Sequence, residues 1–129
     1  SGLNDGDWLH ANSLHYNADL DQIMINLHRL GEFWIIDHNT TTEEAAGPAG
    51  DILYRWGNPT VYSQTAAPEE RVFWGQHDAR WVPEGYPGAG NILVFNNGRN
   101  RPDGAYTTVE ELNPTLLSDG TYELGSNGI

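Results

Sequence analysis

Cysteine and lysine are both absent from this chain, and each absence narrows the kinds of site that it can hold. Without cysteine there is no disulfide framework and no thiolate metal site. Without lysine, all six basic residues are arginine, whose forked guanidinium suits oxyanions and carboxylates. Two explanations stay open for this bias: drift in composition, or retention of arginine where forked hydrogen bonding to an anion matters.

Long apolar runs and an excess of positive charge are also missing. No run approaches the ~18 apolar residues of a membrane span, and no charged-then-apolar leader is present, so we expect no membrane span. The net charge of −12 argues against nucleic acids and anionic membranes as partners, since both require a basic surface. A chain that opens at Ser1 fits a mature N-terminus, a processed product or an excised fragment.

Sustained helical periodicity is scarce, whereas short strand patterns recur along the chain. The 129 residues, of which 38% are apolar, suffice for one small domain with a single core. One short helical turn is expected at residues 41–46, where Gly47-Pro48 ends it. The pattern indicates an all-β fold of about eight short strands, at residues 10–16, 21–27, 32–37, 51–56, 71–74, 77–82, 91–96 and 105–111, with a further candidate around Tyr122.

One strand pattern occurs twice. His10 begins an alternating strand that is followed by a polar turn and DQIMIN, and His77 begins another that is followed by a turn and GNILVFN. Repeats of this kind are typical of β-propeller blades, which take ~40–50 residues each. We therefore expect residues 1–129 to form a partial β-propeller of about two to three blades, with approximate repeat units 1–74 and 75–129. Because a propeller closes only with more blades, missing blades or further protein copies are needed to cover the sheet edges.

The second of these hairpins, residues 75–101, carries the candidate chemistry. His77 lies near one strand end, and Asn97-Gly98 forms a tight turn followed by Arg99 and Arg101. An imidazole can act as nucleophile or general base near neutral pH, and arginine and amide donors can stabilise an oxyanion. The competing interpretation is a buried histidine bonded to backbone carbonyls, beside a solvated turn. Histidines occur at five positions, but their spacing indicates no metal site.

Several segments together resemble the bacterial arylsulfotransferase family. They are DWLHANS (7–13), FWIIDHNTTTEEAA (33–46), GDILYRWGNP (50–59), QHDARW (76–81) and GNILVFNNG (90–98), with Arg101 after them. They cover nearly the whole chain in the family's order. The resemblance implies a six-bladed propeller that moves a sulfuryl group between phenols through a transient sulfohistidine. It also implies that no nucleotide or other cofactor is used, and that the protein is periplasmic or extracellular.

The resemblance also assigns residues. His77 matches the histidine that is sulfated, and His10 matches a second active-site histidine. Where the family has an arginine on the next strand, this chain has His28, with Arg29 one position later. A shift of one residue turns a side chain to the other face of a strand, so Arg29 substitutes only if a bulge redirects it. A further histidine of the family lies upstream of Ser1. The substrate-binding candidates are Arg29, Asn12, Asn97 and Arg101.

Two functions remain open from the sequence. The first is an aryl sulfotransferase-like enzyme that uses a phenolic sulfate as donor and a phenol as acceptor. The alternative is a non-catalytic propeller fragment that serves as a binding or self-assembly module, which fits the replaced arginine and the open sheet edges. The fold alone does not decide, because propellers carry many unrelated functions.

Overall fold

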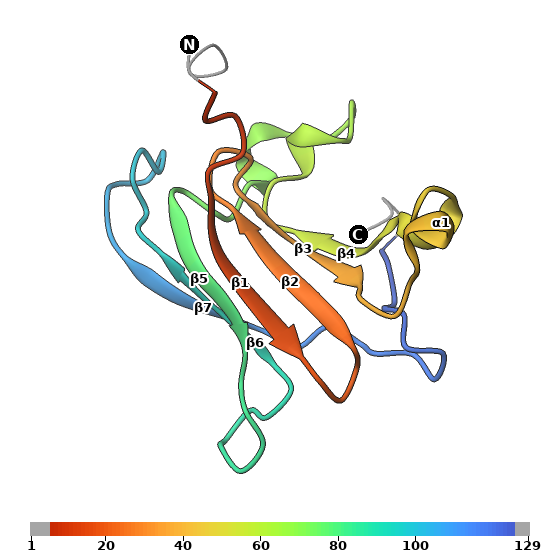
Figure 1. Cartoon of the computed structure of the whole chain (residues 1–129). Helices are drawn as coiled ribbons and strands as arrows, with labels where there is room; N and C mark the ends of the chain where they lie inside the picture. Colours follow the sequence, from red (N-terminus) through yellow and green to blue (C-terminus); the bar gives the residue numbers. More distant parts are fainter. Residues whose placement is uncertain (1–5, 126–129) are drawn as a thin grey trace.

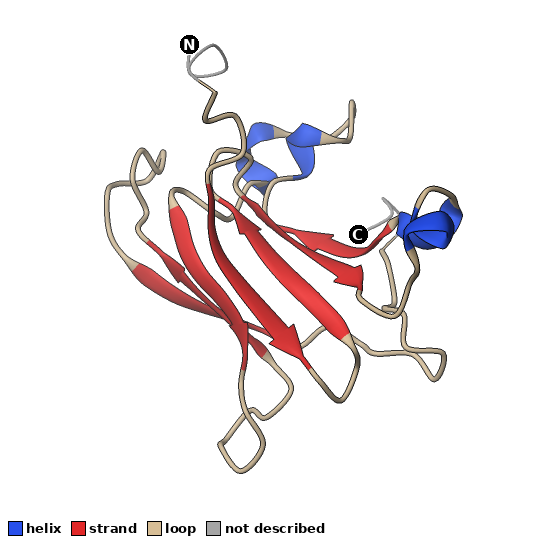
Figure 2. Cartoon of the chain, in the orientation of Figure 1, coloured by secondary structure: helices blue, strands red, loops and turns tan. Residues whose placement is uncertain are grey.

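The computed structural model describes residues 6–125, which form two antiparallel β-sheets joined by loops and short helical turns (Figures 1 and 2). The four strands of the first sheet follow chain order: β1 (Ala11–Asn17), β2 (Gln22–Leu27), β3 (Glu32–Asp37) and β4 (Ile52–Trp56). The second sheet is also a meander, made of β5 (Gln76–Trp81), β6 (Ile92–Asn96) and β7 (Thr108–Leu112). The predicted all-β class is confirmed, and neither sheet closes on itself.

The loop regions contain the helical turns. One predicted turn is confirmed as α1 (Thr42–Ala45). Its start is set by a capping box, because the Glu44 amide donates to Thr41 Oγ1 while the Thr41 amide donates to the Glu44 carboxylate. Three short 3-10 helices follow in loops: η1 (Pro48–Gly50), η2 (Pro59–Val61) and η3 (Pro68–Glu70). Across residues 6–125, no helix has the length and apolar character to cross a membrane.

Residues 71–74 do not form the strand that their composition predicts. The amides of Val72 and Phe73 both bond to the Gly57 carbonyl, at 2.8 and 3.5 Å, and the Trp74 amide bonds to the side chain of Asn96. These bonds satisfy the backbone locally, so no ladder forms there. The candidate strand around Tyr122 is reduced to one isolated bridge with Leu116.

The core lies between the two sheets. Its members are the buried inward-facing side chains of both meanders and of two loops: Met24, Phe33, Ile35, Tyr54, Phe73, Ala79, Trp81, Ile92, Val94 and Tyr122. Burial of this apolar surface is the main force that holds one sheet against the other. The outer faces of the two sheets carry apolar side chains that remain exposed. Examples are Leu14 on β1 and the cross-strand pair of Phe95 on β6 and Val109 on β7.

Strands β1 and β5 lie side by side and run in the same direction (Figure 1). Near their starts, the Asn12 side chain donates to the Gln76 carbonyl at 3.0 Å. Near their ends, the Trp81 amide donates to Nδ1 of His15 at 3.2 Å. The first residues of both strands therefore meet at one end of the molecule.

A buried glutamine fixes the start of β5 against the first sheet. The Gln76 side chain is fully buried, and its Nε2 donates to the carbonyls of Leu27 and Glu32 at 3.0 and 3.2 Å. In return, Asn26 Nδ2 donates to the Gln76 carbonyl at 3.2 Å. This exchange ties β5 to the β2–β3 turn and sets where the next residue, His77, lies.

Candidate functional site

A pocket of about 660 Å³ opens at the end where β1 and β5 begin. Its walls come from four separate parts of the chain and consist of His10, His28, Gly75, His77, Asn97, Arg99, Asn100, Ala105, Tyr106 and Thr107. None of these residues is acidic, although the whole chain has a net charge of −12. The pocket therefore presents basic and polar groups to a ligand, which suits an anion.

Three imidazoles form a row along the pocket. The ring centroids of His10 and His28 are 4.9 Å apart, and those of His28 and His77 are 5.2 Å apart with the rings edge to face. His10 precedes β1, His28 follows β2, and His77 is the second residue of β5. Backbone pairing places the first two rings together, because the His28 amide donates to the His10 carbonyl at 3.2 Å.

His77 is held through one ring nitrogen. Its Nδ1 lies 3.1 Å from the Gly75 carbonyl and 3.0 Å from Asn97 Nδ2, which itself donates to that carbonyl at 2.7 Å. When Nδ1 carries the proton it donates to Gly75, and Nε2 keeps a lone pair, as a nucleophile requires. The opposite tautomer accepts a hydrogen bond from Asn97 instead. The structure thus brings together His77 and Asn97, two of the predicted site residues.

His10 is oriented by an aspartate that sequence reasoning missed. Nδ1 of His10 lies 2.6 Å from Asp7 Oδ2, and Arg29 Nη2 lies 3.1 Å from the same oxygen. Hydrogen bonds from His10 and then Arg29 hold the pKa of Asp7 below its usual value. Arg29 therefore contacts the carboxylate behind His10 and is not part of the pocket wall. The available signal was the spacing of three residues between Asp7 and His10.

His28 occupies the middle of the row, a role for which the sequence provided only its alignment with the family's arginine. Burial lowers the pKa of His28, and the positive charges of His10, His77, Arg29 and Arg99 lower it further. Its Nδ1 is buried and makes no hydrogen bond with the described part of the protein. The ring lies between two other imidazoles, and its lowered pKa favours the neutral form.

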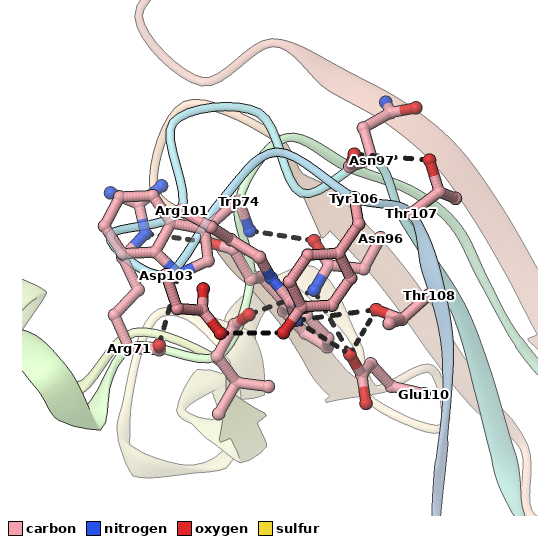
Figure 3. Close-up of polar contacts among 12 residues, drawn as sticks. Arg71, Trp74, Asn96, Asn97, Arg101, Asp103, Tyr106, Thr107, Thr108 and Glu110 are labelled. Atoms are coloured by element: carbon pink, nitrogen blue, oxygen red, sulfur yellow. Dashed lines mark hydrogen bonds and ion pairs between the residues drawn. The ribbon is translucent and has the colours of Figure 1, made fainter.

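The other two predicted substrate-binding residues lie outside the pocket wall. Asn12 donates to the Gln76 carbonyl at 3.0 Å and accepts a bond from Asn26 at 2.5 Å, so it joins the two sheets. Arg101 packs its guanidinium over the Tyr106 ring, 4.4 Å from the centroid, and its Nη2 lies 3.3 Å from Glu110 Oε1 (Figure 3).

Arg99 lines the pocket in place of Arg101. The turn explains the difference, because the Arg101 amide bonds back to the Gly98 carbonyl at 3.3 Å and Asn100 takes the left-handed conformation with φ of 65°. The chain reverses between the two arginines, so their side chains leave in different directions.

Polar contacts hold the loop that forms the outer wall (Figure 3). Glu110 Oε1 accepts from Thr108 Oγ1 at 2.6 Å and from Asn96 Nδ2 at 3.3 Å. The Tyr106 hydroxyl donates to Asp103 at 2.7 Å. Together with Arg101, these bonds place the Tyr106 segment opposite the histidines, so the wall is built by contacts within the second sheet and its loop.

The geometry suits binding of an oxyanion beside the His77 imidazole. Within residues 6–125, no three His, Cys, Asp or Glu side chains are grouped so that they could hold a metal ion. The imidazoles and Arg99 are the basic donors in the pocket lining that an anion could use.

Comparison with protein families provides the remaining observation. The family described as arylsulfotransferase (ASST) matches residues 1–115. Comparisons with curated proteins and with solved structures found no match. The family match covers both sheets and every histidine of the pocket. The chain therefore belongs to the arylsulfotransferase (ASST) family.

Proposed function

We propose that this protein moves a sulfuryl group from a phenolic sulfate to a phenol through a sulfohistidine on His77. The observation that carries the proposal is the pocket itself, where three imidazoles and Arg99 converge without any acidic residue. Family membership supports sulfuryl as the group that is moved. No nucleotide cofactor enters this scheme.

The proposed reaction has two displacements. Nε2 of His77 attacks sulfur, the S–O bond to the donor breaks, and the phenolate leaves with the bonding electrons. An acceptor phenol then gives its proton to water and attacks sulfur, which breaks the S–N bond and frees His77. The released donor phenolate takes up a proton from solvent, so no net proton is gained or lost. His10 and Arg99 stabilise the negative charge on the sulfuryl oxygens. Removal of one such donor commonly lowers the rate by about 10²–10³.

The other candidates take supporting roles in the proposal. Asn97 fixes the His77 ring through the shared Gly75 carbonyl. Arg29 acts on His10 through Asp7. Asn12 and Arg101 maintain the inner and outer walls of the pocket through their contacts with Gln76 and Glu110.

We further propose that the two sheets are neighbouring blades of a larger, six-bladed propeller. Each sheet is a meander, the first strands of the two sheets contact each other, and both sheets contribute side chains to one core. Neighbouring blades of a propeller can meet in this way. The exposed apolar side chains on the outer faces, including Leu14, Phe95 and Val109, then contact missing blades or further copies of the chain. A periplasmic or extracellular location is part of the same proposal.

The second candidate function is a non-catalytic binding or self-assembly module. The same exposed apolar faces favour it, because contiguous apolar surface commonly marks interaction sites. It requires no transfer chemistry and so makes the opposite prediction in an assay.

A transfer assay with p-nitrophenyl sulfate and phenol separates the two candidates. The wild-type chain should release nitrophenol only when phenol is present, and His77→Ala should abolish the release. His38→Ala is the matched control, because that imidazole bonds to Asp21 at the opposite end of the sheet. Radiolabelled sulfate trapped on the wild type but not on His77→Ala would identify the carrier. If phenol fails to promote nitrophenol release at every protein concentration, sulfuryl transfer is refuted and the non-catalytic module remains.

A further inference from the structure

The three imidazoles of the pocket differ in how their ring nitrogens are satisfied. His10 has the Asp7 carboxylate at 2.6 Å, and His77 has the Gly75 carbonyl and Asn97. His28 lies between them, and its buried Nδ1 has no hydrogen-bond partner among the described residues. Its Nε2 lies 3.6 Å from where a Cβ on Gly75 would stand, beside the pocket wall. Within residues 6–125, no acceptor therefore bonds to Nδ1 of this central ring to stabilise a positive charge on it.

Four basic neighbours of His28 oppose its protonation. His10 approaches from before β1, His77 from β5, Arg99 from after β6, and Arg29 from the next position in the chain. The Asp7 carboxylate is engaged by His10 and Arg29. With the pocket empty of anions, these neighbours and partial burial keep the ring neutral.

An anion bound in the pocket favours protonation of His28, because its negative charge stabilises the positive charge of the protonated ring. We propose that sulfate groups bind in this pocket together with a proton that His28 takes up. The inference rests on the proposed function, since it concerns the same pocket, and it names His28 as the residue that couples sulfate affinity to pH. His28 acts here as a binding residue whose charge appears only in the complex.

The sign of the effect follows from linkage. In the free protein the pKa of His28 lies below its usual 6.5, and a bound sulfate raises it. As pH rises between the pKa of His28 in the free protein and its pKa in the complex, the affinity for sulfate falls by up to about tenfold per pH unit. Sulfate affinity is greatest at pH values below the pKa of His28 in the free protein. It reaches a lower plateau at pH values above the pKa of His28 in the complex.

Isothermal titration of the purified chain with inorganic sulfate at pH 5 to 8 tests the proposal, because sulfate stays a fully deprotonated dianion over that range and cannot itself supply a pH dependence. Two buffers of different ionisation enthalpy at each pH measure the protons taken up. We expect the wild type to lose about tenfold in affinity per pH unit within the window. His28→Gln cannot titrate and should flatten the profile. His28→Arg should bind at pH 8 about as tightly as at pH 5.5.

His38→Gln is the control, since it removes an imidazole outside the pocket. If the variants fold poorly, NMR titration of the wild-type imidazoles replaces them, and sulfate should raise the midpoint of His28. A flat wild-type profile, an unchanged slope in His28→Gln or an unchanged His28 midpoint overturns this inference alone. Absence of sulfate binding at every pH overturns the proposed function as well.

Discussion

Replacing Gln76 by leucine tests whether one buried side chain aligns the sheets and thereby builds the pocket. Leucine has a similar volume but cannot donate to the carbonyls of Leu27 and Glu32, which the Gln76 amide reaches at 3.0 and 3.2 Å. The next residue is His77, whose ring meets His28 edge to face. Loss of the two bonds should therefore weaken both the fold and the site.

The magnitude follows from the contacts. Two net hydrogen bonds are worth about 1–3 kcal/mol in total. Part is regained, because Gln76 Oε1 is buried and has no hydrogen-bond partner among the residues that the structure describes, and removing such an acceptor returns about 1 kcal/mol. The expected net loss is therefore about 1 kcal/mol, which lowers the urea midpoint by roughly 0.5 M at an m-value of about 2 kcal/mol/M.

Urea unfolding followed by tryptophan fluorescence measures the loss, and Gln22→Leu is the matched control. Gln22 is also buried, and its amide bonds to Gly120 while its carbonyl accepts from Tyr122, at the other end of the sheet. Both variants should lose stability, but only Gln76→Leu should weaken sulfate binding. An unchanged midpoint in Gln76→Leu, or equal loss of binding in the control, refutes the reasoning.

Gln76→Glu tests the direction in which the stability of a variant at this position changes with pH. Its carboxylate would face two carbonyl oxygens, so burial raises the pKa of the introduced group above the unfolded value of about 4.3. The deficit relative to wild type is then full above the raised value and shrinks as pH falls through it. Unfolding at pH 7.5 and pH 5 should show the deficit narrowing at the lower pH.

Two further substitutions probe the pocket wall and the buried ion pair. Gly98→Ala should cost about 1–2 kcal/mol for its left-handed backbone and also weaken sulfate binding, because the new Cβ would overlap the Tyr106 carbonyl. Gly90→Ala, equally left-handed but in open space, should lose stability alone, and identical binding and melting in the two variants would contradict this. Arg55→Met removes the ion-pair partner of the fully buried Glu32 carboxylate, and burial already raises the pKa of Glu32. The variant should lose about 3–5 kcal/mol of unfolding free energy at pH 7. The loss should shrink at pH 5 as Glu32 protonates, and equal losses by urea unfolding at both pH values would contradict the assignment.

The strands could be read from the sequence wherever turn residues bounded an alternating run. β3 (Glu32–Asp37) coincides with the expected range because Gly31 precedes it and a polar segment follows. Residues 71–74 were misjudged because their partners, the Gly57 carbonyl and the Asn96 side chain, lie elsewhere in the chain. Local composition contains no information about such distant partners.

The candidate site was predictable only where one hairpin contains it. The antiparallel pairing of β5 with β6 places Asn97, the residue after β6, beside His77, as the hairpin pattern implies. The choice between Arg99 and Arg101 depends on the turn conformation at Asn100, which the sequence does not specify. The central place of His28 depends on how two sheets pack, and no local pattern encodes that arrangement.

The uncharged and basic lining of the pocket, within a chain of net charge −12, has a kinetic consequence. A sulfate ester diffusing toward the molecule first meets a repulsive field and is attracted only within a few ångströms of the imidazoles. Added salt screens the long-range repulsion, whose reach is about 8 Å at physiological ionic strength, more than the short-range attraction. Association should therefore speed up with salt, the reverse of the usual behaviour of electrostatically steered ligands.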